Sequence, residues 1–176
     1  KSRIHKVDYK NFLKYRKFIK NDYFKNISNI KNLSFVFTIA KKLKIKIKKI
    51  IKETNNFKGL NFRQQIIYDS KKLMIINDSK STSFSSTQPM LETYEDVYWI
   101  LGGLAKRGDR LALDKKYFNK ISAFIYGKDK NFFAKILDKK IKYNISENLN
   151  NSLKLIFKDI KKSHNGKKVI LFSPSA

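Results

Sequence analysis

The feature that most constrains this fold is an alternation, beyond Gly59, of short apolar runs with stretches of helical periodicity. "QQIIYD" and "KLMIIND" predict two strands joined around Ser70 and Lys71. "VYWILGG" and "ISAFIYG" are apolar runs that each end in glycine, and "KKVILFSPS" after Gly166 predicts a last strand. Strands that alternate with helices indicate an α/β domain with an open, mostly parallel, Rossmann-like sheet and helices on both faces.

The intervening segments show the spacing of amphipathic helices. Helices are predicted at about 84–94, at about 111–119 and at 129–137. A further helix is predicted with its cap at Ser146, and its apolar face carries Leu149, Leu153, Phe157 and Ile160. Each of these helices is expected to cover part of the sheet.

The segment before Gly59 is helical in pattern. Residues 29–43 predict a largely buried helix, because eight apolar positions recur there at helical spacing: Ile30, Leu33, Phe35, Val36, Phe37, Ile39, Ala40 and Leu43. A shorter helix is expected next, with Ile47, Ile50, Ile51 and Thr54 on one face. "NNFKGL" ends it, with Gly59 as the turn residue.

Composition excludes several classes of protein. The 176 residues contain no cysteine and two histidines, so neither a disulfide framework nor a zinc site is expected. No apolar run approaches the roughly 20 residues of a membrane-spanning helix, and the chain is expected to be cytoplasmic. The net charge of +26 suggests a nucleic-acid partner, but lysines outnumber arginines 35 to 5 and are spread throughout. Most of them are therefore expected to be solvated surface residues, without a specific nucleic-acid partner.

Polar residues follow the predicted strands, and ligands of open α/β sheets bind at the carboxyl ends of strands. In "NDSKST", Asp78 can accept hydrogen bonds from sugar hydroxyls, Lys80 can hold a carboxylate, and Thr82 adds a hydroxyl. The simpler alternative is that Asp78 or Ser79 caps the next helix. Between Ser79 and Thr87, seven of nine residues carry a hydroxyl, which that alternative does not explain.

Four stretches, in this order and spacing, resemble the Mur ligases of peptidoglycan synthesis, and their D-glutamate-adding branch in particular: "FKGLNFRQQ", "INDSKST", "YWILGGLAKRGD" and "ILFSPSA". The resemblance implies that residues 1–57 are the tail of a central ATPase domain. Residues 58–176 are then a Rossmann-like C-terminal domain, truncated at its end, that brings the incoming amino acid. The implied protein is a monomer that uses ATP and Mg²⁺ to join D-glutamate to UDP-N-acetylmuramoyl-L-alanine through an acyl phosphate.

The resemblance also assigns residues, one position at a time. Asn32, Arg63 and Asp78 match positions that contact the adenine, the nucleotide and the ribose. Lys80 and Thr82 match the pair that receives the D-glutamate carboxylates, and Lys106 matches a further lysine near that amino acid. No catalytic residue and no metal ligand is assigned within the chain, and the Mg²⁺ ligands are expected before residue 1.

Two positions depart from the family pattern, and two alternatives stay open. Ser28 and Phe62 stand where the family usually has histidines near the nucleotide. The chain is alternatively a basic α/β module that binds RNA, or a relative of the folylpolyglutamate synthetases, which share the domain plan. The "NDSK-x-T" form favours the Mur ligases.

Overall fold

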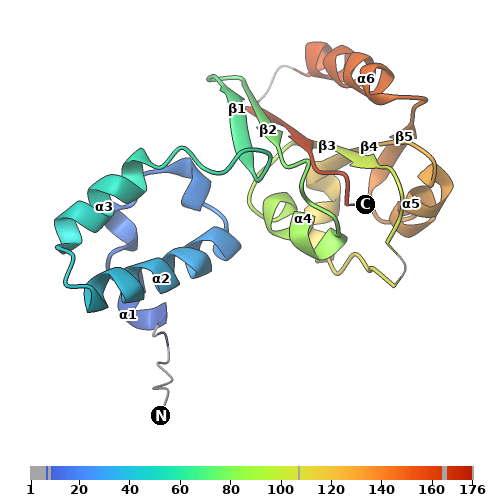
Figure 1. Cartoon of the computed structure of the whole chain (residues 1–176). Helices are drawn as coiled ribbons and strands as arrows, with labels where there is room; N and C mark the ends of the chain where they lie inside the picture. Colours follow the sequence, from blue (N-terminus) through green and yellow to red (C-terminus); the bar gives the residue numbers. More distant parts are fainter. Residues whose placement is uncertain (1–6, 8, 107, 164–165, 176) are drawn as a thin grey trace. The chain divides into compact units, whose positions relative to one another are not determined.

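The computed structural model of the chain (Figure 1) describes residues 7, 9–106, 108–163 and 166–175. They form two compact units that divide after Gly59. The first unit is helical, and the second is an α/β sheet domain. In the described part of the chain, every helix is too short or too polar to cross a lipid bilayer.

The first unit is built around one amphipathic helix. Its elements are α1 (Tyr9–Leu13), the 3-10 turns η1 (Arg16–Phe18) and η2 (Asp22–Phe24), α2 (Ile27–Lys42) and α3 (Ile47–Asn56). The α2 helix starts where it does because the Asn26 side chain caps its first turn by accepting the Asn29 N–H. Its buried face packs into a small core of Phe12, Ile19, Phe24, Ile30, Leu33, Phe37, Ala40 and Ile50.

The expectation that residues 29–43 form a largely buried helix is wrong for this unit. Phe35, Val36, Ile39 and Leu43 are more than half exposed. The segments that pack on α2 within the unit cover only the face that carries Ile30, Leu33 and Phe37. The apolar pattern predicted the helix correctly, but the width of an apolar stripe does not show how many neighbours cover it.

The second unit is a six-stranded sheet in the order β1-β2-β6-β3-β4-β5. Its strands are β1 (Gln65–Asp69), β2 (Leu73–Asn77), β3 (Val97–Gly102), β4 (Ile121–Tyr126), β5 (Lys142–Ile145) and β6 (Lys168–Phe172). Only the β1–β2 pair is antiparallel, and all other neighbours are parallel. The last strand in sequence therefore lies inside the sheet, between β2 and β3.

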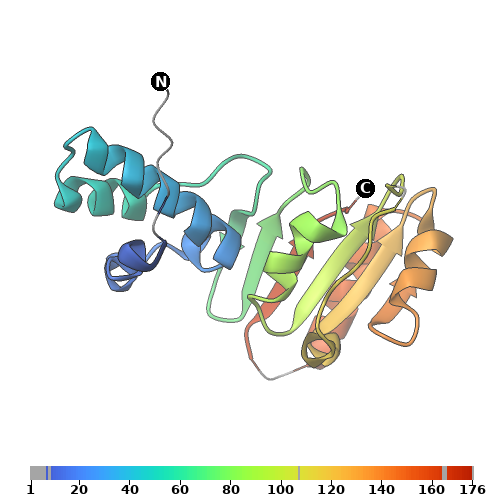
Figure 2. The ribbon, with the colours of Figure 1, turned by 90° about the horizontal axis from the view of Figure 1, so that it is seen from below.

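Helices cover both faces of this sheet, as predicted (Figures 1 and 2). Helices α4 (Phe84–Leu91) and α5 (Lys130–Leu137) pack with Trp99, Leu101 and Ile125 on one face. Helix α6 (Leu149–Lys162) packs on the other face, where Ile156 meets Ile100, Phe124 and Ile170. Successive strand residues point to opposite faces, so the continuous apolar runs of β3 and β4 are what two covered faces require.

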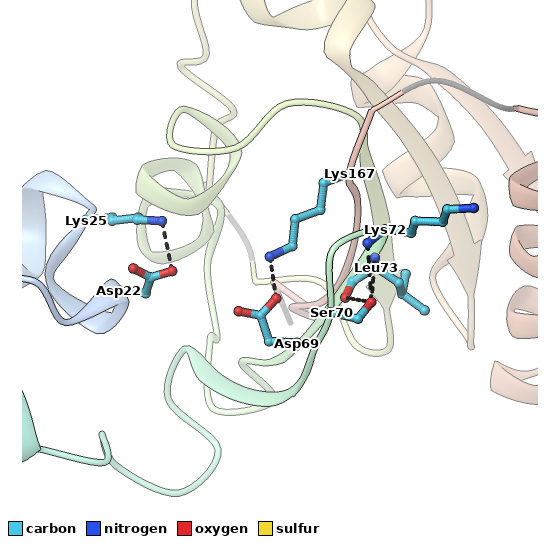
Figure 3. A network of polar contacts seen from close by, with 7 residues as sticks. All are labelled: Asp22, Lys25, Asp69, Ser70, Lys72, Leu73 and Lys167. Carbon is cyan, nitrogen blue, oxygen red and sulfur yellow. Dashed lines mark hydrogen bonds and ion pairs between the residues drawn. The ribbon is translucent and has the colours of Figure 1, made fainter.

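The β1–β2 hairpin closes through side chains that Figure 3 shows. The Ser70 hydroxyl accepts the backbone N–H of Leu73 at 3.0 Å and that of Lys72 at 3.3 Å, which fixes the turn. Lys167, just before β6, forms an ion pair with Asp69 at the end of β1. The edge strand is thus held at its turn and through a contact with the segment that enters β6.

Three sequence expectations differ from the structure. No α-helix forms at 111–119: the chain makes only a 3-10 helix, η3 (Lys115–Lys120), where the Asp114 side chain accepts the Lys116 N–H. Strand β5 was not predicted, because its four residues at the sheet edge include Lys142 and Asn144 and are half-buried or exposed. The N-cap of α6 is Asn148 instead of Ser146.

A core substitution tests the predicted packing of α5. Leu137 is fully buried, so Leu137→Ala should lower the free energy of unfolding of the second unit by about 2–5 kcal/mol. Urea unfolding followed by the fluorescence of Trp99, the single tryptophan, isolates this unit.

The matched control is Leu155→Ala on α6, where the same side chain is 38% exposed. Its change should stay below about 1 kcal/mol, because less apolar area is lost from the interior. Equal effects of the two variants would contradict the packing of α5 on the sheet.

Candidate functional site

The segment that carries Arg63 is a tight loop held against the end of β2. The backbone N–H of Arg63 donates to the Leu60 carbonyl at 3.1 Å, and Phe62 and Gln64 adopt positive φ angles of 64° and 50°. Non-glycine residues rarely adopt this conformation, so the surrounding contacts must enforce it. Two hydrogen bonds hold it: Lys80 N–H donates to the Phe62 carbonyl at 3.1 Å, and Gln64 N–H donates to Asp78 Oδ1 at 3.0 Å.

Asp78 lies beneath this loop, with only 4% of its surface exposed. Its Oδ1 atom accepts the Gln64 N–H, and its Oδ2 atom accepts the Ser173 hydroxyl at 3.0 Å. Burial raises the pKa of the Asp78 carboxyl, and the hydrogen bonds from Gln64 and Ser173, with the nearby Arg63 charge, oppose that rise. The carboxylate therefore joins the Arg63 loop to the ends of β2 and β6.

A groove of about 670 Å³ opens above Asp78. It is lined by Phe62, Arg63, Ser79, Lys80, Thr82, Ser83 and Ser86. Two of the residues that line it are cations, four carry hydroxyl groups and none is acidic. Such a surface suits an anion, since cations and hydroxyl donors both favour carboxylate or phosphate oxygens.

The structure thus brings together three residues that the sequence singled out. Arg63, Lys80 and Thr82 line one groove, and all three side chains are exposed. Asp78 lies two residues before Lys80 and is buried under the Arg63 loop. Phe62, where the resemblance led us to expect a histidine, lines the groove, and its carbonyl accepts the Lys80 N–H.

The helix behind the groove is not capped by Asp78 or Ser79, so the simpler alternative for these residues is wrong. Helix α4 begins at Phe84, and its N-cap is Ser83, whose hydroxyl accepts the Ser86 N–H. The Phe84 N–H donates to Asp109 Oδ2 at 2.6 Å. Side chains of the protein itself therefore accept hydrogen bonds from the backbone N–H groups of Phe84 and Ser86 at the start of α4.

Lys106 lies in the loop that follows β3, and its side chain is exposed. Asp129 holds one side of this loop by accepting the Ala105 N–H at 2.8 Å. Asp109 holds the other side through its bond to the start of α4, beside the groove. Lys106 is not among the residues that line the groove, but its loop is tied to the helix behind it.

Gly102, at the end of β3, is required by packing. A Cβ atom there would lie 1.8 Å from the Tyr126 carbonyl oxygen, and its φ is +131°. No side chain fits at that distance. The glycine thus allows the close approach of β3 and β4, a packing role that involves no ligand.

Asn32 belongs to the first unit, where its side chain is exposed on α2. Ser28, at the other position where the family has histidine, is in the first turn of that helix. Among the described residues, no group of three or more His, Asp or Glu side chains is placed to hold a metal ion.

The structure also shows residues that sequence reasoning missed. Ser81, Thr87, Ser173 and Ser175 are buried and hydrogen-bonded to one another beneath the groove. The density of hydroxyls between Ser79 and Thr87, with "SPS" after the last strand, was the available signal. Which of those hydroxyls face inward depends on where α4 starts, and the sequence left that open.

Comparisons with known proteins place this geometry in a family. No model of a known protein family matches the chain. The chain is 32% identical over 156 residues to the UDP-N-acetylmuramoylalanine–D-glutamate ligase of Rickettsia prowazekii, covering 88% of this chain and 35% of the relative. It is 30% identical over 148 residues to the ligase of the same name from a Wolbachia of Brugia malayi, with 84% and 30% covered. The chain thus spans about a third of the length of these relatives.

Solved structures agree on the fold. UDP-N-acetylmuramate-alanine ligase MurC from Thermotoga maritima superposes with a TM-score of 0.64 at 16% identity, covering 86% of this chain and 35% of that one. MurF from Acinetobacter baumannii gives a TM-score of 0.63 at 15% identity, with 85% and 35% covered. The structures show the fold, and the sequence relatives show the family: the chain belongs to the Mur ligases.

Proposed function

We propose that this chain is part of an ATP-dependent ligase that adds D-glutamate to UDP-N-acetylmuramoyl-L-alanine in peptidoglycan synthesis. The observation that carries the proposal is the groove that joins Arg63, Lys80 and Thr82 at one strand end. Its relatives, named as D-glutamate ligases, support the choice of amino acid. Carbon–nitrogen bond formation follows when ATP has phosphorylated the muramoyl-alanine carboxylate and the D-glutamate amine displaces phosphate.

The roles of the groove residues follow from their chemistry. Lys80 and Thr82 receive the carboxylates of D-glutamate, because a dicarboxylate needs a cation and a hydroxyl donor on the same surface. Lys106 adds a second cation from its neighbouring loop. Holding both carboxylates leaves the amine as the group free to attack, which is orientation catalysis without a proton-transfer residue in this chain.

The nucleotide is assigned to the other side of the strand end. Arg63 reaches the phosphates or the ribose of the nucleotide from the loop above β2. Asp78 accepts a hydrogen bond from a ribose hydroxyl, because its carboxylate has lone pairs that the bonds from Gln64 and Ser173 do not use. Asn32 contacts the adenine from α2. In this proposal residues 1–57 are the end of a central ATPase domain, and residues 58–176 form the amino-acid-adding domain of a monomeric, cytoplasmic enzyme that also needs Mg²⁺.

The assignment of Lys80 predicts a selective loss. In the complete ligase, Lys80→Ala should raise the KM for D-glutamate roughly 10- to 150-fold, because a lost charge-assisted hydrogen bond costs about 1.5–3 kcal/mol. The KM for ATP should change by less than about 2-fold, since Lys80 is assigned to the amino acid alone. Steady-state kinetics with each substrate varied in turn measures both.

Lys158→Ala is the matched control, because Lys158 is an exposed lysine on α6, across the sheet from the groove. It removes the same charge and should leave both KM values unchanged. An equal increase in the two KM values for Lys80→Ala would contradict the assignment of this residue to D-glutamate.

The net charge of +26 is the observation that favours one alternative function, RNA binding. If the lysines serve as solvated surface residues, RNA and DNA should bind weakly, without sequence preference, and should dissociate as salt rises toward about 0.15 M. Fluorescence anisotropy of labelled oligonucleotides across a salt series measures this. Tight binding that persists at that ionic strength would favour the RNA-binding function.

A further inference from the structure

A continuous set of hydroxyl contacts connects the groove to the buried carboxylate of Asp78. Ser86 lines the groove, and its Oγ lies 2.7 Å from Ser81 Oγ. Ser81 Oγ lies 2.8 Å from Thr87 Oγ1, which lies 2.6 Å from Ser173 Oγ. Ser173 donates to Asp78 Oδ2. The chain of contacts spans three segments of the fold: the β2–α4 loop, helix α4 and the end of β6.

Thr87 is the hub of this set. Its side chain is fully buried, and its hydroxyl contacts those of Ser81, Ser173 and Ser175, the last at 2.7 Å. A hydroxyl has one proton to donate and two lone pairs to accept with, so three partners use its whole capacity. Among the described residues, no buried polar side-chain atom lacks a partner, so the network is satisfied as it stands.

Proton counting gives the contacts a direction. Ser173 gives its single proton to Asp78, so Thr87 must donate to Ser173. Thr87 then accepts from Ser81 and from Ser175. The more distant Thr87 contact to the Ser83 carbonyl, at 3.4 Å, loses this competition for the proton. The protons of Thr87 and Ser173 therefore point toward Asp78.

The position of Ser81 gives this network a functional consequence. Ser81 lies between Lys80 and Thr82, the two residues assigned to the amino acid, and its backbone also donates to Asp78 and accepts from Ser175. Lys80 and Thr82 are exposed, and both line the groove. What fixes this stretch from below is the Ser81–Thr87 contact, with the backbone bonds around it.

We propose that Thr87 is a positioning residue: its hydroxyl locks residues 80–82 to the ends of β2 and β6 and so sets the spacing of the Lys80 and Thr82 groups that bind the substrate. The proposal rests on the proposed function, because it takes D-glutamate as the ligand of that pair. Thr87 itself touches no ligand. Its effect passes through Ser81, and a misplacement of about 1 Å at a binding group is enough to matter.

The test replaces Thr87 by valine, which keeps the shape and removes the hydroxyl. In the complete ligase, Thr87→Val should raise the KM for D-glutamate about 10- to 100-fold, while Thr87→Ser, which restores the hydroxyl, should stay within about 3-fold of wild type. Thr93→Val is the control: it is the same substitution just after α4, where the hydroxyl donates to the Pro89 carbonyl and lies outside the Thr87 network. It should leave the KM unchanged.

A second readout does not depend on the substrate. In the 176-residue chain, amide hydrogen exchange at Ser81 and Thr82 should accelerate in Thr87→Val and return to the wild-type rate in Thr87→Ser. Trp99 fluorescence reports whether the sheet domain is still folded. If Thr87→Val does not fold, Ser81→Ala takes its place, because it cuts the link to residues 80–82 and leaves the Thr87–Ser173 contact intact.

The outcomes separate the two proposals. A wild-type enzyme that shows no dependence on D-glutamate overturns the proposed function, and the exchange measurement then decides whether Thr87 holds the loop. A wild-type enzyme that uses D-glutamate, with an unchanged KM and unchanged exchange in Thr87→Val, overturns the role of Thr87. A raised KM that Thr87→Ser does not restore also overturns it, because the hydroxyl would then not be the active feature.

Discussion

The whole site depends on one pairing, the insertion of β6 between β2 and β3. β6 is the last strand in sequence, and it runs parallel to both of its neighbours. Phe172, at its end, lies opposite Asn77 of β2 on one side and opposite Ile100 of β3 on the other. Because strands that run in parallel end at the same edge, this pairing brings Asp78 next to Ser173, 95 residues away. Removing β6 would leave the Asp78 carboxylate buried without its hydroxyl partner.

The site is built in two layers with different jobs. The upper layer consists of exposed cations and hydroxyls that meet the solvent: Arg63, Lys80 and Thr82. The lower layer consists of buried, fully paired groups, with Asp78 and Thr87 at its centre. A buried polar group without a partner costs about 1–3 kcal/mol of stability, so the groups of the lower layer can adopt few arrangements. Because these groups are bonded to the segment that carries Lys80 and Thr82, they also restrict the backbone of that segment.

Sequence reasoning predicted the α/β class and five of the six strands, because strand runs have clear local patterns. It missed β5, whose polar edge residues show no apolar run, and it took 111–119 for a helix where spacing alone was ambiguous. The hydroxyl network escaped because its members are joined across 86 residues, as in the Thr87–Ser173 contact, and no local pattern carries such a pairing.

Lysine chemistry explains why the lower layer matters for selectivity. A lysine side chain is a point charge on a flexible stem with about 2 kcal/mol of rotamer entropy, so the charge of Lys80 alone defines no geometry. In a chain with 35 lysines, many surface sites offer a similar cation. What distinguishes Lys80 is the fixed position of its backbone, whose N–H is held by the Phe62 carbonyl and whose neighbour Ser81 is held by Thr87. If Lys80 binds a carboxylate as proposed, the buried hydroxyls set the geometry of that contact without touching the carboxylate themselves.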